Sequence, residues 1–207
     1  MQTPLDWISV GRRIQAISQT GMAYAKSPYD LERYQELSAI AAALLAGPEP
    51  QASALALGLF SAQAGYATPK VDVRGAVFRE GRLLLVREAE DGGWTFPGGW
   101  AEVGQSASES VEREVREESG YLVKAVKLLA CWDRNRHPHP PIPFHAYKLL
   151  FHCEITGGAP AISSETTEVA FFAENEIPPL STTRTLPEQI RFAFACWRDP
   201  SAATAFD

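Results

Sequence analysis

Three glutamates stand close together in the middle of the chain: Glu114, Glu117 and Glu118. Residues at positions i, i+3 and i+4 share one face of a helix, so a helix here would bring three carboxylates side by side. Like charges at this spacing destabilise a helix by roughly 0.2–0.5 kcal/mol per pair, and a cation over the face would remove the repulsion. Carboxylate oxygens are ligands that Mg²⁺ and Mn²⁺ prefer. The alternative is a solvated acidic face that pairs with Arg113 and Arg116.

The sequence around the glutamates favours the metal site. The segment 98–121, GGWAEVGQSASESVEREVREESGY, places glycines before and after the expected helix. It resembles the Nudix box of the Nudix hydrolases at six fixed positions, namely Gly99, Arg113, Glu114, Glu117, Glu118 and Gly120. Chance would give such a match on the order of 10⁻⁵ times in a chain of this length. The seventh position, a glutamate in the family, is Gln105, whose amide oxygen can still accept a hydrogen bond from Arg113 without charge assistance.

The resemblance covers about residues 70–200 and implies the Nudix fold, a mixed sheet between helices. It also implies hydrolysis of a nucleoside diphosphate linked to a group X, giving a nucleoside monophosphate and phospho-X. Mg²⁺ or Mn²⁺ is the implied cofactor, with Glu114, Glu117 and Glu118 as ligands and with Glu118 among the catalytic residues. The family often supplies a base, or a further metal ligand, from a loop ahead of the last strand. Glu165 is our candidate there, in preference to Glu168.

A narrower resemblance links the chain to one bacterial Nudix subgroup that carries an extra helical domain and includes CDP-choline and ADP-ribose pyrophosphatases. It rests on the amino-terminal helices and on three segments: GYATPKVDVRGAVF, PGGWAEVGQ and WDRNRHPHPP. An arginine can bind phosphate through its planar fork, and a tryptophan can stack on a base. The expected substrate-binding residues are therefore Arg74, Trp132, Arg134 and His137, although Trp132 could equally be a core residue.

The elements that position these residues fall into two regions. Residues 1–66 form the predicted helical domain, with helices over 5–19, 28–46 and 52–64 at apolar 3.6-residue spacing. Residues 67–207 form the predicted Nudix domain. Its last helix is expected to begin at Thr185, which with Glu188 has capping-box spacing. The irregular alternation of elements predicts an α/β (α+β) fold with a mixed sheet. Its remaining elements are a helix over 106–119 and strands over 71–78, 82–88, 94–96, 124–134, 144–155 and 167–173.

Composition narrows the classes of function. The 207 residues carry a net charge of −6, which disfavours non-specific binding to nucleic-acid backbones. Three widely spaced cysteines argue against a disulfide framework or a zinc site. We find no signal peptide and no apolar run long enough to span a membrane, so the cytoplasm is the expected location.

Two further functions stay open beside the leading one. A ligand-binding regulator on the Nudix fold without turnover would be expected to lose the box carboxylates, which this chain keeps. An RNA-end-processing hydrolase could use the same site, and the cluster from Arg134 to His139 leaves that alternative open. The first 65 or so residues make a thin core for an independent domain. We therefore expect a homodimer in which these helices form much of the interface and wall part of the pocket for a small nucleoside diphosphate derivative.

Overall fold

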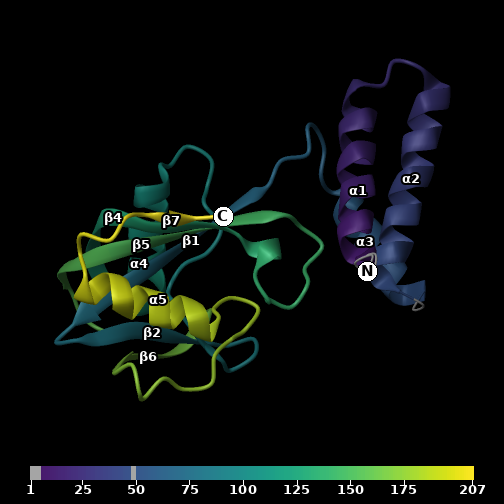
Figure 1. Ribbon diagram of the computed structural model, residues 1–207. Coiled ribbons are helices and arrows are strands. Elements are labelled where there is room, and N and C mark those ends of the chain that lie inside the picture. Colours follow the sequence, from purple (N-terminus) through teal and green to yellow (C-terminus); the bar gives the residue numbers. More distant parts are fainter. Residues whose placement is uncertain (1–5, 48–49) are drawn as a thin grey trace, which may run out of the picture. The chain divides into compact units, whose positions relative to one another are not determined.

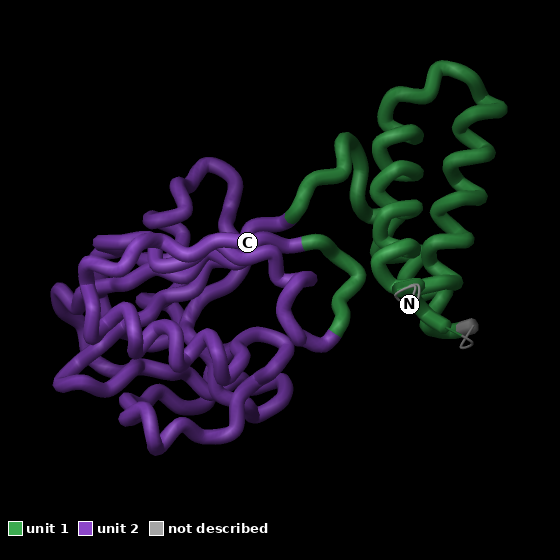
Figure 2. Tube along the Cα trace, in the orientation of Figure 1, with its two compact units in different colours: residues 1–69, 141–145 green, residues 70–140, 146–207 purple. Residues whose placement is uncertain are grey.

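The computed structural model describes residues 6–47 and 50–207 and divides the chain into two compact units (Figure 2). The first unit comprises the described residues up to Pro69 together with Pro141–His145. The second comprises Lys70–Pro140 and Ala146–Asp207. The division falls a few residues after the expected boundary at 66/67 and assigns one distant loop to the first unit. In the described residues, no helix is long and apolar enough to cross a membrane.

Three helices form the first unit: α1 (Trp7–Tyr24), α2 (Pro28–Ala46) and α3 (Pro50–Ser61). The Asp6 carboxylate caps α1 by accepting a hydrogen bond from the amide of Ile8 at 3.1 Å. Proline at the first position of α2 fits the helix start, and α2 ends at Gly47, whose positive φ of 67° suits glycine. The predicted helix start at residue 5 and the expected stop at Pro48 lie outside the described residues.

The buried face of α1 differs from the expected apolar stripe. Within the unit, α1 buries the small or polar residues Gly11, Gln15, Ser18 and Gln19. Trp7 and Ile17, which belong to the stripe, are 58% and 54% exposed. The core of this unit is small, with Ala41, Ala42 and Phe60 at its centre. Ile14 of the predicted stripe packs against this core, whereas Trp7 and Ile17 stay exposed, so only part of the stripe packs within the unit.

The second unit is built on a mixed sheet, as predicted, with strand order β3-β2-β1-β5-β4-β7 and with β6 paired to β2 (Figure 1). Its helices are α4 (Ala107–Ser119) and α5 (Pro187–Arg198), and Arg134–Arg136 form one 3₁₀ turn. The strands are β1 (Lys70–Arg79), β2 (Arg82–Glu88), β3 (Trp94–Thr95), β4 (Tyr121–Asp133), β5 (Ala146–Gly158), β6 (Thr166–Phe172) and β7 (Ala205–Phe206).

Alternate residues of β1 face two different cores. Val73 and Val77 pack with Val111 and Val115 of α4. Ala76 belongs instead to the cluster that includes three residues of α5, Ile190, Ala193 and Phe194. Because successive side chains of a strand point to opposite faces, α4 and α5 cover opposite sides of β1. The sheet is therefore buried on both faces at this strand.

The path of β1 explains the position of residues 97–99, the glycine turn that precedes α4. β1 pairs with β2 only at its carboxyl end, Phe78↔Leu83 and Arg79↔Arg82. Along its other edge it runs parallel to β5 from Lys70 to Val77. The free edge near its start is taken by residues 97–101 instead, where the amides of Val73 and Gly75 donate to the carbonyls of Gly99 and Pro97. This pairing fixes the turn that leads into α4.

The expected start of the last helix is wrong by one residue. The N-cap is Leu186, because Pro187 occupies the first helical position, where a missing N–H costs nothing. Gln189, three residues after the cap, accepts a hydrogen bond from the Leu186 amide. The Thr185 hydroxyl instead bonds to the hydroxyl of Thr95, at 2.7 Å. The capping pattern therefore lies one residue further along the chain than predicted, at Leu186 and Gln189.

Candidate active site

The acidic helix α4 is held firmly at both ends. Ser106 and Glu109 form a reciprocal capping box at its start, and Gly120 ends it in the left-handed conformation (φ 77°). Its apolar face packs closely on β1, since a Cβ on Gly75 would lie 2.6 Å from the Val115 side chain. Glycine at this position therefore lets α4 approach the strand. The capped ends and this close packing fix the position of the α4 carboxylates relative to β1.

Two glycines bring the turn before α4 against these carboxylates. Gly98 has φ 145°, and a Cβ there would lie 2.0 Å from the carbonyl oxygen of Val73. Its amide donates to Oε2 of Glu118 at 2.8 Å. A Cβ on Gly99 would lie 2.9 Å from Oε2 of Glu114. The turn thus places backbone, without any intervening side chain, directly beside the first and last glutamates of the box.

Burial makes Glu118 an unusual carboxyl group. Its side chain is only 5% exposed, and burial raises its pKa to about 8. Repulsion from Glu88 and Glu114 acts in the same direction, whereas Arg74 and the Gly98 hydrogen bond favour the charged form. Burial likewise raises the pKa of Glu114. Both groups would be stabilised as carboxylates by an added cation.

The third box glutamate has a different setting. Glu117 is half exposed, and its carboxylate lies 2.8 Å from Arg113 and 3.6 Å from Arg116. Arg113 also bonds to Glu114, at 2.7 Å. The predicted contact with Gln105 is confirmed, because Nε of Arg113 donates to the Gln105 amide oxygen at 3.2 Å. The box arginine thus holds two of the three carboxylates and is itself oriented by a neutral partner.

The donors fit a hard divalent cation by their chemistry. Glu114 and Glu118 supply carboxylate oxygens at partly and fully buried positions, and burial raises the pKa of both against the opposing effect of nearby arginines. Among the described residues, no three His, Cys, Asp or Glu side chains are gathered closely enough to form a metal group as they stand. Glu117, turned toward Arg113 and Arg116, would have to leave those partners to join the other two. Its role as a ligand stays a prediction.

Of the two candidate bases, Glu168 is engaged elsewhere. It lies on β6 and pairs with Arg87 at 2.5 Å. Glu165 precedes β6, is exposed, and its carbonyl oxygen accepts a hydrogen bond from the Ala89 amide. The next residue, Thr166, donates its hydroxyl to the carbonyl oxygen of Glu118 at 2.9 Å. Glu165 therefore adjoins a segment tied to the box helix, which agrees with its predicted place.

The predicted substrate-binding residues mostly have partners within the fold. Trp132 is buried and packs edge-to-face on Phe192, with ring centres 5.2 Å apart. Arg134 is buried, and its guanidinium donates to the carbonyls of Pro140 and Thr183, both at 2.9 Å. His137 lies at the end of the same segment, 3.2 Å from the Asp207 carboxylate. Burial favours the core interpretation of Trp132 and a structural use of Arg134.

Arg74 is also buried, and its guanidinium bonds to Asp72 and to the carbonyl oxygen of Phe96. Of the four predicted substrate contacts, only His137 is not buried.

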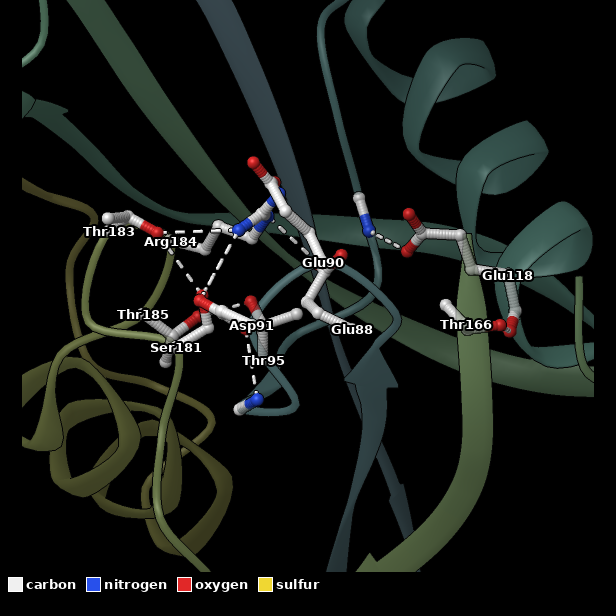
Figure 3. Close-up of polar contacts among 12 residues, drawn as sticks. Glu88, Glu90, Asp91, Thr95, Glu118, Thr166, Ser181, Thr183, Arg184 and Thr185 are labelled. Atoms are coloured by element: carbon white, nitrogen blue, oxygen red, sulfur yellow. Dashed lines mark hydrogen bonds and ion pairs between the residues drawn. The ribbon is translucent and has the colours of Figure 1, made fainter. Parts of the chain in front are cut away.

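Glu88 and Arg184 were not singled out from the sequence. Glu88 ends β2 and is buried, and its carboxylate lies 3.1 Å from Nε of Arg184 (Figure 3). Arg184 also pairs with Glu90 at 2.6 Å and approaches Asp91 at 3.6 Å. Burial raises the pKa of Glu88. A signal was available, since Glu88 lies two residues after the apolar run LLLV (residues 83–86), where a charged residue close to the core needs a partner.

Comparisons with known proteins agree with this geometry. Residues 5–56 match the family described as a UDP-X-like, N-terminal oligomerisation domain, and residues 68–192 match the NUDIX domain. YjhB of Bacillus subtilis (strain 168), provisionally named an ADP-ribose pyrophosphatase, is 44% identical over 97% of both chains.

Two solved structures are also similar. The crystal structure of an ADP-ribose pyrophosphatase from Streptococcus suis 89-1591 has a TM-score of 0.62 and 36% identity, and the match covers 68% of this chain and all of the other. A UDP-X diphosphatase has a TM-score of 0.64 and 30% identity over 98% of both chains. The second match extends over both regions of the chain.

Proposed function

Because the chain belongs to the Nudix hydrolase family, we propose that it hydrolyses the diphosphate linkage of a nucleoside diphosphate joined to a second group X. The products are a nucleoside monophosphate and phospho-X. The names of the similar proteins favour ADP-ribose or a UDP-linked compound over CDP-choline as the substrate type. The observation that carries the proposal is the close approach of Gly98 and Gly99 to Glu118 and Glu114, because it places two of the box carboxylates beside the same backbone turn.

Mg²⁺ or Mn²⁺ is the proposed cofactor, and Glu114 and Glu118 are its proposed principal ligands, with Glu117 as a third. When bound, such an ion neutralises phosphate oxygens and lowers the pKa of a coordinated water. The chain's own residues supply the rest. The Gly98 amide orients the Glu118 carboxylate, and Arg113 holds Glu114 in place until the site is loaded.

Glu165 is the proposed base that takes the proton from the attacking water. It is exposed, as a group that must exchange protons with solvent can be, and its neighbour Thr166 is anchored to the backbone of Glu118. For substrate contacts outside the box we retain His137, whose side chain is partly exposed. The burial of Trp132 and Arg134 argues that these two shape the fold beneath it.

We also propose that the chain forms a homodimer through its first unit. The matching family is described as an oligomerisation domain. The unit exposes large apolar side chains that would be covered in an assembly, among them Trp7, Ile17 and Leu55. It also carries an open groove of about 680 Å³, lined in part by Tyr24, Tyr34 and Tyr66. These features fit a surface that packs against another copy.

A substrate panel tests the proposed function. The purified chain is incubated with Mg²⁺ and ADP-ribose, a UDP-sugar, CDP-choline, NADH or a short 5′-triphosphate RNA, and the phosphate-containing products are identified. We expect preferential cleavage of one of the nucleoside diphosphate compounds, and loss of that cleavage in Glu118→Gln or on chelation of the metal. Preferential cleavage of RNA would point to the end-processing alternative. Absence of turnover on the whole panel would support a binding protein and contradict the proposal.

A further inference from the structure

Three charged side chains lie together in the interior of the second unit: Asp72, Arg74 and Lys148. They are 5%, 6% and 2% exposed, respectively. Nε of Arg74 donates to Oδ1 of Asp72 at 3.0 Å, and its NH2 lies 3.0 Å from the same oxygen. Oδ2 of Asp72 is bonded to Nζ of Lys148, which stands opposite it in the parallel pairing of β1 with β5. The carboxylate thus uses both oxygens to hold two cations.

Burying three charged side chains lowers the stability of the fold unless their mutual contacts compensate for the lost hydration. Taking a charge out of water costs several kcal/mol per ion, and a close partner must repay it. Burial lowers the pKa of Lys148 to about 8, while the two cations hold the pKa of Asp72 below its usual value against the effect of burial. One anion and two cations leave an excess of one positive charge. Two acidic residues, Glu118 and Glu88, lie close enough to Arg74 to interact with this excess positive charge.

Arg74 connects this buried group to the glycine turn. Its NH1 donates to the carbonyl oxygen of Phe96 at 3.1 Å, two residues before Gly98. The neighbouring amide of Gly75 donates to the Pro97 carbonyl at 2.9 Å. Two consecutive carbonyls ahead of Gly98 are therefore held from β1. The second of these carbonyls, that of Pro97, belongs to the same peptide as the Gly98 N–H that donates to Glu118.

We propose that Arg74 is a positioning residue of the active site: anchored by Asp72 and Lys148, it fixes the Phe96–Gly98 turn so that the Gly98 amide orients the Glu118 carboxylate. This role replaces direct contact with substrate phosphate, the role expected from the sequence. The part of this inference that concerns catalysis rests on the proposed function. The part that concerns the structure is that Arg74 maintains the hydrogen bond between Gly98 and Glu118.

A single amide resonance reports on that hydrogen bond. Pro97–Gly98 is the one Pro–Gly pair in the sequence. Labelling proline with ¹³C at the carbonyl and glycine with ¹⁵N therefore selects the Gly98 amide in a carbonyl-edited NMR spectrum of the full chain. Glu118→Gln serves as the reference at pH 9, where the wild-type carboxyl is ionised, because a neutral acceptor weakens the bond and should move the resonance upfield.

The test variant is Arg74→Lys, which keeps the charge but has one nitrogen where arginine has three. Lysine cannot both hold Asp72 and reach the Phe96 carbonyl. We expect the Gly98 resonance to move in the same direction as in Glu118→Gln. We also expect kcat on the preferred substrate to fall by about tenfold or more at saturating Mg²⁺, with KM within about threefold of the wild type. If Arg74→Lys does not fold, the double variant D72N/K148M removes the anchor and keeps Arg74, and the same resonance shift is expected.

Val123→Ala is the matched control. Val123 is buried in the same unit but on β4, paired with Ile155, and belongs to the core beneath α4. It should lower thermal stability without moving the Gly98 resonance or kcat. An unmoved Gly98 resonance in Arg74→Lys would overturn the inference, as would a KM that rises tenfold while kcat holds, since that pattern indicates substrate contact. The NMR readout needs no substrate, so it decides the inference even if the substrate panel refutes the proposed function.

Discussion

Glu118→Gln should make the metal-free protein more stable at neutral pH while abolishing its turnover. The folded pKa of Glu118 is about 8, against an ordinary value of 4.5. Each pH unit between the unfolded and the folded pKa is worth about 1.4 kcal/mol, so the raised pKa costs the fold about 3.5 kcal/mol at pH 7 and about 5 kcal/mol above pH 8. Glutamine avoids this cost, and because the wild-type carboxyl is still mostly protonated at pH 7, the Gly98 hydrogen bond weakens by less than about 1 kcal/mol. We expect a net gain of about 3 kcal/mol, or roughly 6–12 °C in Tm.

The sign of the pH dependence follows from the raised pKa. Below pH 4.5, Glu118 is protonated in both the folded and the unfolded chain, so the wild type and the variant should differ little. As pH rises from 4.5 to about 8, the unfolded chain releases the proton while the folded chain retains it, and the wild type loses stability. The advantage of the variant should therefore grow across this window and level off above it.

Thermal unfolding in a chelating buffer at several pH values between 4.5 and 9 measures this difference. Glu117→Gln is the control, because Glu117 lies on the same helix but is half exposed and paired with two arginines. Its effect should stay within about 1 kcal/mol at every pH. Added Mg²⁺ should stabilise the wild type and leave Glu118→Gln almost unchanged. Equal stability of the wild type and Glu118→Gln at pH 8 would refute the electrostatic account of the site.

Three other predictions concern the turn, the box and the first unit. Gln105→Glu should change kcat by less than about tenfold, since it strengthens one existing hydrogen bond to Arg113; a thousandfold change would show a direct role. Gly98→Ala should reduce turnover more than a hundredfold and lower Tm, because its Cβ would lie 2.0 Å from the Val73 carbonyl oxygen; a wild-type rate would contradict this. Deleting residues 1–66 should give a monomer by light scattering with a raised KM, and an unchanged KM would show that these helices do not shape the substrate site.

The box helix could be predicted from the sequence because its signals are local. The capping residue Ser106, the closing Gly120 and the spacing of the glutamates all lie within one short segment. The contact between Gln105 and Arg113 was implied by the resemblance to the Nudix box, in which a glutamate at this position pairs with the box arginine. What spacing could not supply is the burial of each carboxylate. Glu117 and Glu118 are neighbours in sequence, yet one is half exposed and the other is enclosed beneath the glycine turn.

The segment WDRNRHPHPP shows why donor-rich sequences are ambiguous. Arginines and histidines at a strand end could equally bind a phosphate or satisfy backbone carbonyls, because both present oxygen acceptors. In the structure, Arg134 and His139 bind backbone carbonyls, since they donate to those of Thr183 and Thr182, respectively. The decisive partners lie more than 40 residues away along the chain, on the loop that carries Arg184. Arg74 follows the same logic, because Lys148, the second cation that holds its partner Asp72, is brought opposite Asp72 only when β1 and β5 pair. Charged residues next to a recognised catalytic motif are therefore as well suited to hold that motif in place as to touch its substrate.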